Sequence, residues 1–341
     1  MRIGLIARCE HSRGLGVLLK NFYDNMPVER VLLVRMRQVI GTEMTDWYPG
    51  ATEVRYDPVG ECLPEDAVRE WIAGLDVVYT AETPYDWRLP KWCIEAGVKL
   101  VVHGMPEFVA HGNPAYDRGF DHPDQWWWPT SWRLNYLPPG RVMRIPLNRR
   151  EVKRSDDPRL HIVHVVGHRA VFDRNGTDVV IQAMRGVTVD VKLTIHSHEG
   201  PFPFSRNPRV ELVQVSEPVD DQWSMYEDQD VLLLPRRYGG LCMPALEAAA
   251  CGLVVAMPEC SPNEELAAVQ VPCSTRRKYS LPGGQTPAYD TNPNSLAGTI
   301  KWLSRQLQND QLRSLRSDQD ALFRDWDTWR PKYIEAFQDL L

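Results

Sequence analysis

Short apolar runs alternate with longer stretches of mixed polarity along the chain. In the first 150 residues these runs predict five buried strands, at Ile3–Ala7, Arg30–Val34, Val77–Thr80, Leu100–His103 and Val142–Ile145. Segments between several of them, such as Gly16–Met26 and Glu65–Gly74, have the three-to-four spacing of a helix. Strands that alternate with helices are typical of a parallel sheet in a doubly wound α/β fold.

The charged segment 148–159 interrupts this pattern, and a second series of strand-like runs follows it. These runs are His161–Val166, Val191–Ile195, Val210–Val213, Val231–Leu234 and Leu253–Ala256. We therefore expect two α/β domains, 1–150 and 151–320, with a ligand site in the cleft between them. Residues 321–341 carry an apolar stripe and predict a helix that packs on the protein's own surface.

The composition excludes several classes of protein. The chain has 341 residues, a net charge of −6 and 43% hydrophobic residues, which is ordinary for a globular protein. The negative charge argues against a basic surface for nonspecific nucleic-acid binding. No apolar run approaches the roughly 18 residues that span a bilayer, so we expect no stable membrane insertion. Seven cysteines without C-x-x-C spacing indicate reduced thiols in the cytoplasm and no metal site.

One glycine-containing loop in the second half carries candidate chemistry for phosphate binding. The strand before it ends at Gly167, the loop holds Arg169 and Arg174, and a helix follows Gly176. The N–H groups of a helix N-terminus and two arginines together suit a diphosphate. An ordinary loop with solvated arginines explains the same residues equally well.

A second loop precedes an alanine-rich helix that holds a single acid, Glu247. Gly239 and Gly240, which follow Tyr238, allow a ligand to approach the backbone closely. A carboxylate at Glu247 fits a ribose diol, because it can accept hydrogen bonds from two hydroxyl groups. Its position alone favours an ordinary glutamate on the helix surface.

The first half offers further candidates. Gly14 and Gly16 follow the first strand and could contact a phosphate, but Leu19 replaces the third glycine of a dinucleotide fingerprint. A nicotinamide-dependent dehydrogenase is therefore disfavoured. His103 ends a strand, where it either faces the ligand crevice or is a structural histidine. Three consecutive tryptophans, 126–128, are not expected to face the core together, and an exposed one could stack on a sugar or base.

Taken together, these segments resemble GT-B glycosyltransferases, and glycosyltransferase family 4 most closely. VVGHRAVFDRNGTDVVIQAM, residues 165–184, resembles that family's strand, Gly-Arg, loop, Lys-Gly and helix. VLLLPRRYGGLCMPALEAAACGLVVAMP, residues 231–258, resembles its donor-binding Glu-x7-Glu segment. NPNSLAGTIKWL and the late Trp-rich helix resemble its closing elements, and residues 1–26 resemble glycosyltransferase-like proteins of actinobacteria and their phages.

The resemblance implies two Rossmann-like domains, an N-terminal one for the acceptor and a C-terminal one for the nucleotide sugar. The last helix would cross back to the first domain. The resemblance also implies a hexosyltransferase that uses a nucleotide diphosphate sugar, with a UDP-sugar favoured. The enzyme would retain the anomeric configuration and would need no metal or other cofactor. The acceptor stays open between a protein, a modified DNA base, a glycan and a small molecule. The enzyme would act in the cytoplasm, that of the host if it is phage-encoded.

The resemblance also assigns roles to single residues. Glu247 matches the second glutamate of the motif, which holds the nucleotide ribose. Arg169 and Arg174 take the catalytic roles of the family's Arg and Lys at the diphosphate, and His103 resembles the histidine near the donor sugar. The other donor-binding positions are Gly14, Gly16, Gly167, Tyr238, Gly239, Gly240, Leu241 and Cys242.

The sequence departs from the family pattern at two places. Gly239 replaces the first glutamate of the motif, which contacts the sugar hydroxyls, so the donor sugar stays open. The basic residues of the first loop are each displaced by one position relative to Gly167 and Gly176. A nucleotide-sugar epimerase and a catalytically altered sugar-nucleotide-binding protein are therefore the alternatives.

Overall fold

The computed structural model describes most of the chain, which divides into two compact units. The described residues are 1–8, 14–35, 45–57, 62–109, 121–167, 173–197, 200–217, 219, 221–281 and 284–341. Unit 1 consists of Met1–Pro146, Ser280–Gln285 and Arg324–Leu341. Unit 2 consists of Leu147–Tyr279 and Thr286–Phe323.

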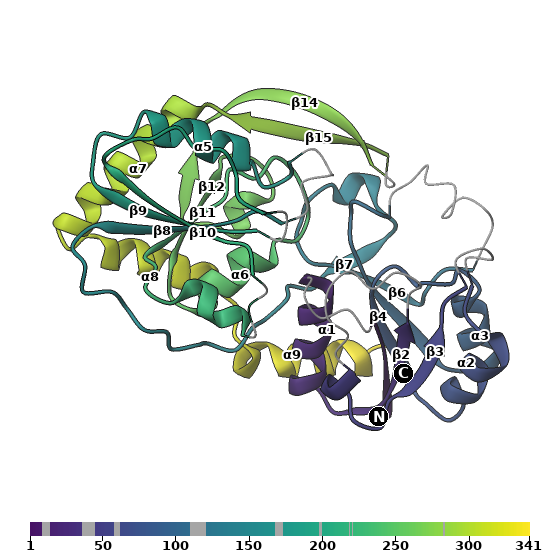
Figure 1. Ribbon diagram of the computed structural model, residues 1–341. Helices are drawn as coiled ribbons and strands as arrows, with labels where there is room; N and C mark the ends of the chain where they lie inside the picture. The colour runs from purple at the N-terminus through teal and green to yellow at the C-terminus, as the bar shows by residue number, and fades with distance from the viewer. Residues whose placement is uncertain are drawn as a thin grey trace. The chain divides into compact units, whose positions relative to one another are not determined.

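Unit 1 is built on a seven-stranded parallel sheet with the strand order β3-β2-β1-β4-β5-β6-β7 (Figure 1). The strands are β1 (Ile3–Arg8), β2 (Val28–Arg35), β3 (Thr52–Arg55), β4 (Val77–Glu82), β5 (Lys99–Gly104), β6 (Gln125–Trp128) and β7 (Gly140–Val142). The helices are α1 (Gly14–Asn25), α2 (Glu65–Ile72), α3 (Leu89–Ala96) and α9 (Trp326–Gln338), with short 3-10 turns at Thr45–Trp47 and Leu134–Tyr136. Chain order reverses between β1 and β4, which makes their carboxyl ends the switch point of this sheet.

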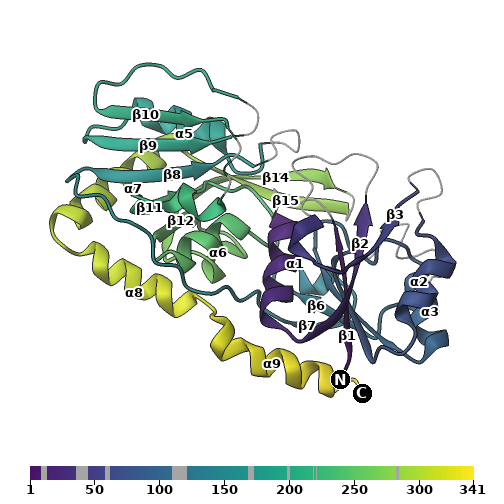
Figure 2. The same cartoon turned by 60° about the horizontal axis from the view of Figure 1, so that its bottom comes forward.

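Helices cover both faces of the unit 1 sheet, as Figure 2 shows. On one face α2 and α3 bury Trp71 and Trp92 against strand residues such as Val78 and Leu100. On the other face lie α1 and α9. A parallel sheet covered in this way can bury every residue of a central strand, which explains the continuous apolar runs of the sequence.

The three consecutive tryptophans show this arrangement directly. Trp126 and Trp128 stack on the α2–α3 side, with ring centroids 5.4 Å apart, whereas Trp127 packs against Phe337 of α9 at 4.8 Å. All three are buried. The expectation that they would not all face the core was wrong, because β6 has a core on each side, and none of the three presents an exposed ring to a sugar.

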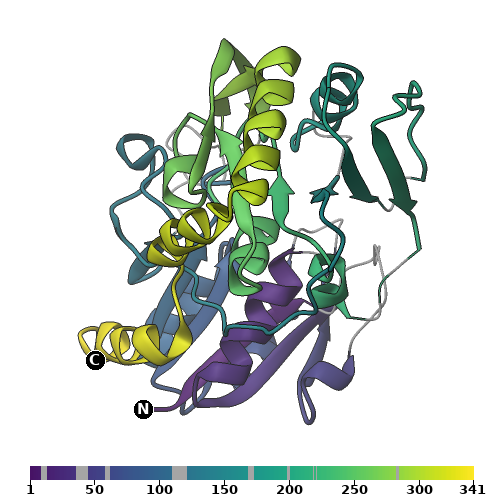
Figure 3. The ribbon, with the colours of Figure 1, turned by 90° about the vertical axis from the view of Figure 1, so that its left-hand side faces the viewer.

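The C-terminal helix α9 belongs to unit 1, as the sequence predicted. Its Trp326 and Tyr333 lie 6.4 Å and 6.1 Å from the ring of Phe22 on α1. The Tyr333 hydroxyl also donates a hydrogen bond to the Arg144 carbonyl oxygen at 2.9 Å. The two chain ends consequently lie on the same side of this unit (Figure 3).

Unit 2 is built on a six-stranded parallel sheet with the strand order β10-β9-β8-β11-β12-β13. The strands are β8 (Leu160–Val165), β9 (Val191–His196), β10 (Val210–Val215), β11 (Val231–Leu233), β12 (Val254–Pro258) and β13 (Val269–Val271). A separate pair is formed by β14 (Cys273–Leu281) and β15 (Gly284–Thr291), which belong to unit 2 except for Ser280–Gln285. The helices are α5 (Thr177–Arg185), α6 (Met243–Ala250), α7 (Pro293–Gln308) and α8 (Leu312–Leu322), with 3-10 turns η3 (Gln222–Tyr226) and η4 (Asn263–Glu265).

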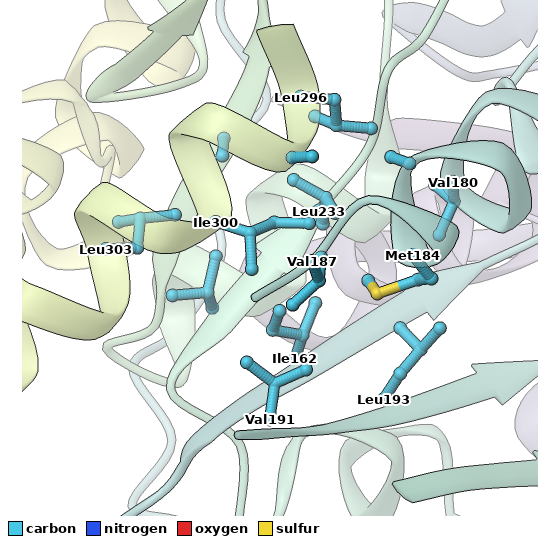
Figure 4. Packing of buried hydrophobic residues seen from close by; sticks show 14 of the residues in the cluster. Ile162, Val180, Met184, Val187, Val191, Leu193, Leu233, Leu296, Ile300 and Leu303 are labelled. Atoms are coloured by element: carbon cyan, nitrogen blue, oxygen red, sulfur yellow. The ribbon is translucent and has the colours of Figure 1, made fainter. Parts of the chain in front are cut away.

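The core of unit 2 is most continuous between the sheet and the helices α5 and α7 (Figure 4). Met184 of α5 and Ile300 of α7 meet strand residues such as Ile162, Leu193 and Leu233 there. Helices α6 and α8 contact the sheet at β11 and β12. This packing fixes the positions at which β8 and β11 end, and those two ends carry the candidate site.

Candidate functional site

The candidate site lies at the switch point of the unit 2 sheet. β8 and β11 are neighbours in the sheet, but the chain continues from β8 to β9 on one side and from β11 to β12 on the other. The loop after β8 leads toward α5, and the loop after β11 leads into α6. Open α/β sheets bind their ligands at the carboxyl ends of the strands at such a point.

Arg174 connects the two loops. Its Nε donates a hydrogen bond to the Tyr238 carbonyl oxygen at 3.2 Å, and its guanidinium lies 5.3 Å from the centroid of the Tyr238 ring. The Arg237 N–H donates to the Arg174 carbonyl oxygen at 2.9 Å. The structure therefore brings the predicted residues Arg174, Tyr238 and Gly239 together.

Gly239 has a backbone conformation that favours glycine. Its φ is +126°, in the region that favours glycine. A Cβ here would overlap Nη2 of both Arg174 and Arg236. Arg236 is only 3% exposed, and its Nε donates to the Tyr238 carbonyl oxygen at 3.0 Å. Where the family resemblance expects a glutamate side chain, the structure holds two guanidinium groups.

The next residue, Arg237, has a different environment. Its Nε lies 2.7 Å from Asp290 Oδ1, its Nη2 lies 2.7 Å from Asp178 Oδ1, and its Nη1 lies 3.2 Å from Asp173 Oδ2. Burial lowers the pKa of Arg237, but the carboxylates outweigh it and the net shift is upward. Arg237 thus joins the β11 loop to α5 and β15 and has its charge matched inside the protein.

The N-terminus of α5 is already capped by a carboxylate. Asp173 Oδ1 accepts a hydrogen bond from the Thr177 N–H at 3.1 Å, and Oδ2 accepts one from the Asp178 N–H at 3.0 Å. Burial raises the pKa of Asp173, but these hydrogen bonds and the charge of Arg237 lower it to about 2. The sequence predicted a phosphate at this helix end, after Gly176, but an anionic side chain of the protein holds its N–H groups instead.

The N-terminus of α6 is built differently. Cys242 is its N-cap residue and makes no side-chain capping hydrogen bond. The Cys242 carbonyl oxygen accepts hydrogen bonds from the N–H groups of Ala245 and Leu246 at 3.1 Å and 3.2 Å. Gly240 and Leu241 lead into this helix end beside Gly239. The start of α6 therefore differs from that of α5, where the Asp173 carboxylate accepts from the first N–H groups.

Glu247 on α6 is buried rather than exposed. It is 4% exposed, and its Oε2 accepts a hydrogen bond from the Tyr226 hydroxyl of η3 at 2.6 Å. Burial raises the pKa of Glu247 to about 7, and the hydrogen bond from Tyr226 opposes this shift. The interpretation of Glu247 as a helix-surface residue was therefore wrong. Buried acids with raised pKa values are common at functional sites.

His164 fixes the ends of the elements around the site. Its Nδ1 donates to the Leu233 carbonyl oxygen at 2.8 Å, since a carbonyl can only accept. Its Nε2 lies 2.9 Å from Thr177 Oγ1 and accepts from that hydroxyl. Burial lowers the pKa of His164, which keeps the ring neutral. One side chain thus ties β8 to the end of β11 and the start of α5.

Gly167 lies just after β8 and packs closely against Asn175. Its φ is +66°, and a Cβ there would lie 2.9 Å from Nδ2 of Asn175. That Nδ2 donates a hydrogen bond to the Val165 carbonyl oxygen at 2.9 Å. Arg169, which the sequence placed in the same loop, lies outside the described residues.

The remaining predicted residues belong to unit 1. Gly14 is the first residue of α1, and Gly16 is buried in its first turn. His103 on β5 is fully buried, and its Nδ1 lies 3.0 Å from the Tyr79 hydroxyl. Burial lowers the pKa of His103 to about 3, against the smaller opposite effect of the Met143 backbone. The imidazole is therefore neutral.

Sequence reasoning missed Arg236, Asp173, Tyr226 and His164. The doublet Arg236-Arg237 at the end of a buried strand was a visible signal for the first of these. Among the described residues, no group of three or more His, Cys, Asp or Glu side chains is arranged to hold a metal ion. Every described helix is too short or too polar to cross a lipid bilayer.

No protein-family model matches the sequence, and no curated protein matches it. Solved structures do match over nearly the whole chain. HepE of Anabaena in complex with UDP superposes with a TM-score of 0.67 at 13% identity, covering 99% of this chain and 100% of that one. Its complex with UDP-glucose gives a TM-score of 0.68 at 12% identity, with coverages of 99% and 100%.

Sucrose-phosphate synthase from Thermosynechococcus elongatus matches with a TM-score of 0.61 at 13% identity, covering 100% of this chain and 99% of that one. At such identities the similarity establishes the fold. The chain has the GT-B fold of these glycosyltransferases, with two parallel-sheet α/β units and C-terminal helices, and the predicted fold class is confirmed.

Proposed function

We propose that the protein is a glycosyltransferase that moves a sugar from a nucleotide diphosphate sugar, with a UDP-sugar favoured, to an acceptor. The observation that carries the proposal is the start of α6 with Arg174 beside it, at the switch point of the unit 2 sheet. The GT-B fold agrees with it, and the similar HepE structures contain UDP and UDP-glucose. We assign the donor to residues 151–320 and the acceptor to residues 1–150.

The diphosphate is assigned to the start of α6. The backbone of Gly240, Leu241 and Cys242 would approach it there, and the Arg174 guanidinium would lie beside it. Negative charge grows on the diphosphate as the bond to the sugar breaks. A fixed guanidinium and a helix N-terminus stabilise that charge more in the transition state than in the ground state. The proposed transfer therefore needs no metal.

The ribose is assigned to Glu247. Tyr226 holds Oε2 of this carboxylate, so the proposal gives the ribose hydroxyls the other oxygen, Oε1. Gly167 shapes the loop on the opposite side of the switch point, and Arg169 stays in its proposed place at the diphosphate. Gly14 and Gly16 would let the backbone at the start of α1 approach the donor.

His103 is assigned to the surroundings of the donor sugar. Because its ring is buried, neutral and hydrogen-bonded to Tyr79, the structure favours a positioning role over proton transfer. We also propose that the anomeric configuration is retained and that the protein resembles family 4 enzymes of the actinobacterial or phage type.

The test is turnover of radiolabelled UDP-sugars by the purified protein, with and without candidate acceptors. Release of UDP with transfer of the label to an acceptor or to water is the expected result. Interconversion of the sugar without release of UDP would instead identify an epimerase, and tight binding without turnover a binding protein. If no nucleotide sugar binds or reacts, the proposal is wrong.

Two further measurements test the finer parts of the proposal. The anomeric configuration of the first-formed product, followed by NMR, should equal that of the donor. Activity should be unchanged in EDTA, because arginines supply the positive charge at the diphosphate. Loss of activity in EDTA that magnesium or manganese restores would contradict metal independence.

A further inference from the structure

Arg174 and Arg236 converge on one peptide group from two different elements. Arg174 lies in the loop before α5, and Arg236 lies just beyond the end of β11. Their Nε atoms donate to the same Tyr238 carbonyl oxygen, at 3.2 Å and 3.0 Å. Their Nη2 atoms both lie too close to the position of a Gly239 Cβ for that atom to be added without a shift. The two guanidinium groups are therefore close neighbours that face the same stretch of backbone.

Glycine at position 239 is what allows this convergence. A side chain there would displace both guanidinium groups, and its φ of +126° would strain the backbone of any other residue. Glycine at this position therefore has two effects. The carboxylate of the resembling family is absent, and the guanidinium groups of Arg174 and Arg236 have space beside the backbone.

Arg236 is 3% exposed, so the surrounding protein holds its guanidinium group in place. The edge of a guanidinium group matches the two oxygens of a phosphate or carboxylate, and two such groups side by side offer several N–H donors to one oxyanion. The start of α6, four residues beyond Gly239, adds a partial positive charge.

We propose that Arg236 is a second anion-binding residue of the donor site, and that with Arg174 it holds one anionic group of the donor above Gly239. The inference rests on the proposed function. The group is an oxyanion of the donor beyond the first phosphate, either the second phosphate of the diphosphate or a carboxylate on the transferred sugar. Arg236 is then a residue that determines donor specificity.

The experiment compares the binding of UMP, UDP, UDP-glucose and UDP-glucuronic acid to the wild type and three variants by calorimetry. The variants are Arg236→Gln, Arg236→Lys and the control Arg209→Gln. Arg209 is an exposed arginine of the same unit that pairs with Asp190 at 3.2 Å, so its loss removes the same charge elsewhere. Thermal unfolding of each variant verifies that it is folded.

If the second phosphate is the anion, Arg236→Gln weakens UDP and both UDP-sugars by about tenfold to a hundredfold and leaves UMP unchanged. If a sugar carboxylate is the anion, the variant weakens UDP-glucuronic acid by that factor and leaves UDP and UDP-glucose unchanged. Arg236→Lys should show part of the same loss, because an ammonium group lacks the two-nitrogen edge. Arg209→Gln should bind all four compounds as the wild type does.

Wild-type affinity of folded Arg236→Gln for all four compounds would overturn the inference and leave the proposed function standing. If Arg236→Gln does not fold, the affinities of Arg236→Lys test the inference instead. Unchanged affinities in Arg236→Lys would overturn the inference that Arg236 and Arg174 together bind an anion. A wild-type protein that binds none of the four compounds would instead refute the proposed function itself.

Discussion

At Gly239 the backbone adopts a φ of +126°, and the guanidinium groups of Arg174 and Arg236 fill the space of a side chain. The sequence showed that a glycine replaces the glutamate of the resembling family at this position. It did not show what takes the place of the missing carboxylate, because Arg174 lies far from Gly239 in sequence and only the fold brings them together. The charge of the candidate site is therefore a property of the packing around one glycine.

We predict that Gly239→Ala destabilises the protein and weakens nucleotide binding. The strained φ alone costs roughly 1–3 kcal/mol, and the added methyl group displaces both guanidinium groups. Denaturant unfolding and UDP titration measure the two effects. Gly298→Ala on α7 is the matched control, since open space surrounds that glycine and alanine raises helix stability by about 0.5–1 kcal/mol. A Gly239→Ala protein as stable as the wild type would contradict this account.

A second residue-scale prediction concerns Glu247. Its pKa is about 7 in the folded protein against 4.5 as the ordinary value, so the folded state binds its proton more tightly than the unfolded state does. Stability must then fall as the pH rises through this interval, by about 3 kcal/mol once the pH is well above 7. Glu247→Gln removes the titration and still offers an oxygen to the Tyr226 hydroxyl.

Glu247→Gln should therefore be about as stable as the wild type at the acidic end of this interval and more stable at pH 8. Chemical denaturation at pH 5 and pH 8 measures the difference. Equal effects of the substitution at both pH values would show that Glu247 does not titrate as described.

Some site residues could be recognised from the neighbouring sequence alone, whereas others depend on contacts between distant segments. Glycines and a lone acid in a loop-to-helix segment were recognisable, because turn chemistry and helix starts are local. The hydrogen bond from Tyr226 to Glu247 and the Asp173 cap on α5 could not be recognised from the sequence, because each depends on which oxygen faces which donor in the folded chain. The sequence therefore did not show that the Asp173 carboxylate accepts from N–H groups at the helix end proposed for a phosphate.

Among the elements, most strands with continuous apolar runs were predicted, whereas the tryptophan-rich strand β6 and the edge strands β3 and β13 were missed. β4 and β9 agree with their predicted ranges at the start of each strand. β3, an edge strand, buries only Val54 of its four residues and has no apolar run to detect. β7 spans Gly140–Val142 rather than the predicted Val142–Ile145, because pairing with β6 sets its register.

The helix α9 provides a prediction at this scale. Phe337 is fully buried and its ring lies 4.8 Å from that of Trp127, 6.1 Å from Tyr79 and 6.2 Å from Phe22. Phe337→Ala should cost roughly 3–5 kcal/mol, because it leaves a cavity among aromatic rings.

Trp329→Ala on the same helix is the control, since Trp329 is partly exposed and packs beside Lys332. It should cost clearly less. Urea unfolding followed by circular dichroism compares the two variants, and equal losses would mean that α9 is not anchored through its aromatic face.

At the scale of the whole molecule, we predict that UDP stabilises the folded protein. A ligand that binds only the folded state adds about 2.7 kcal/mol at a concentration of 100 times its dissociation constant. Uridine, which has no phosphate for Arg174 and Arg236, should stabilise the protein less at the same concentration. A thermal-unfolding series with uridine, UMP and UDP measures this, and an absence of any shift with UDP would count against a donor site in unit 2.

Unit 1 combines segments from the beginning and the end of the chain, and this affects how the chain folds during synthesis. Phe22, Tyr79 and Trp127 are translated early, but their partners on α9 follow only after the whole of unit 2. During synthesis the ribosome therefore releases unit 2 complete while one aromatic face of unit 1 is still bare. This aromatic face of unit 1 therefore stays exposed in the nascent chain until the last helix has been synthesised. Chaperones that recognise exposed aromatic residues can bind it throughout that interval.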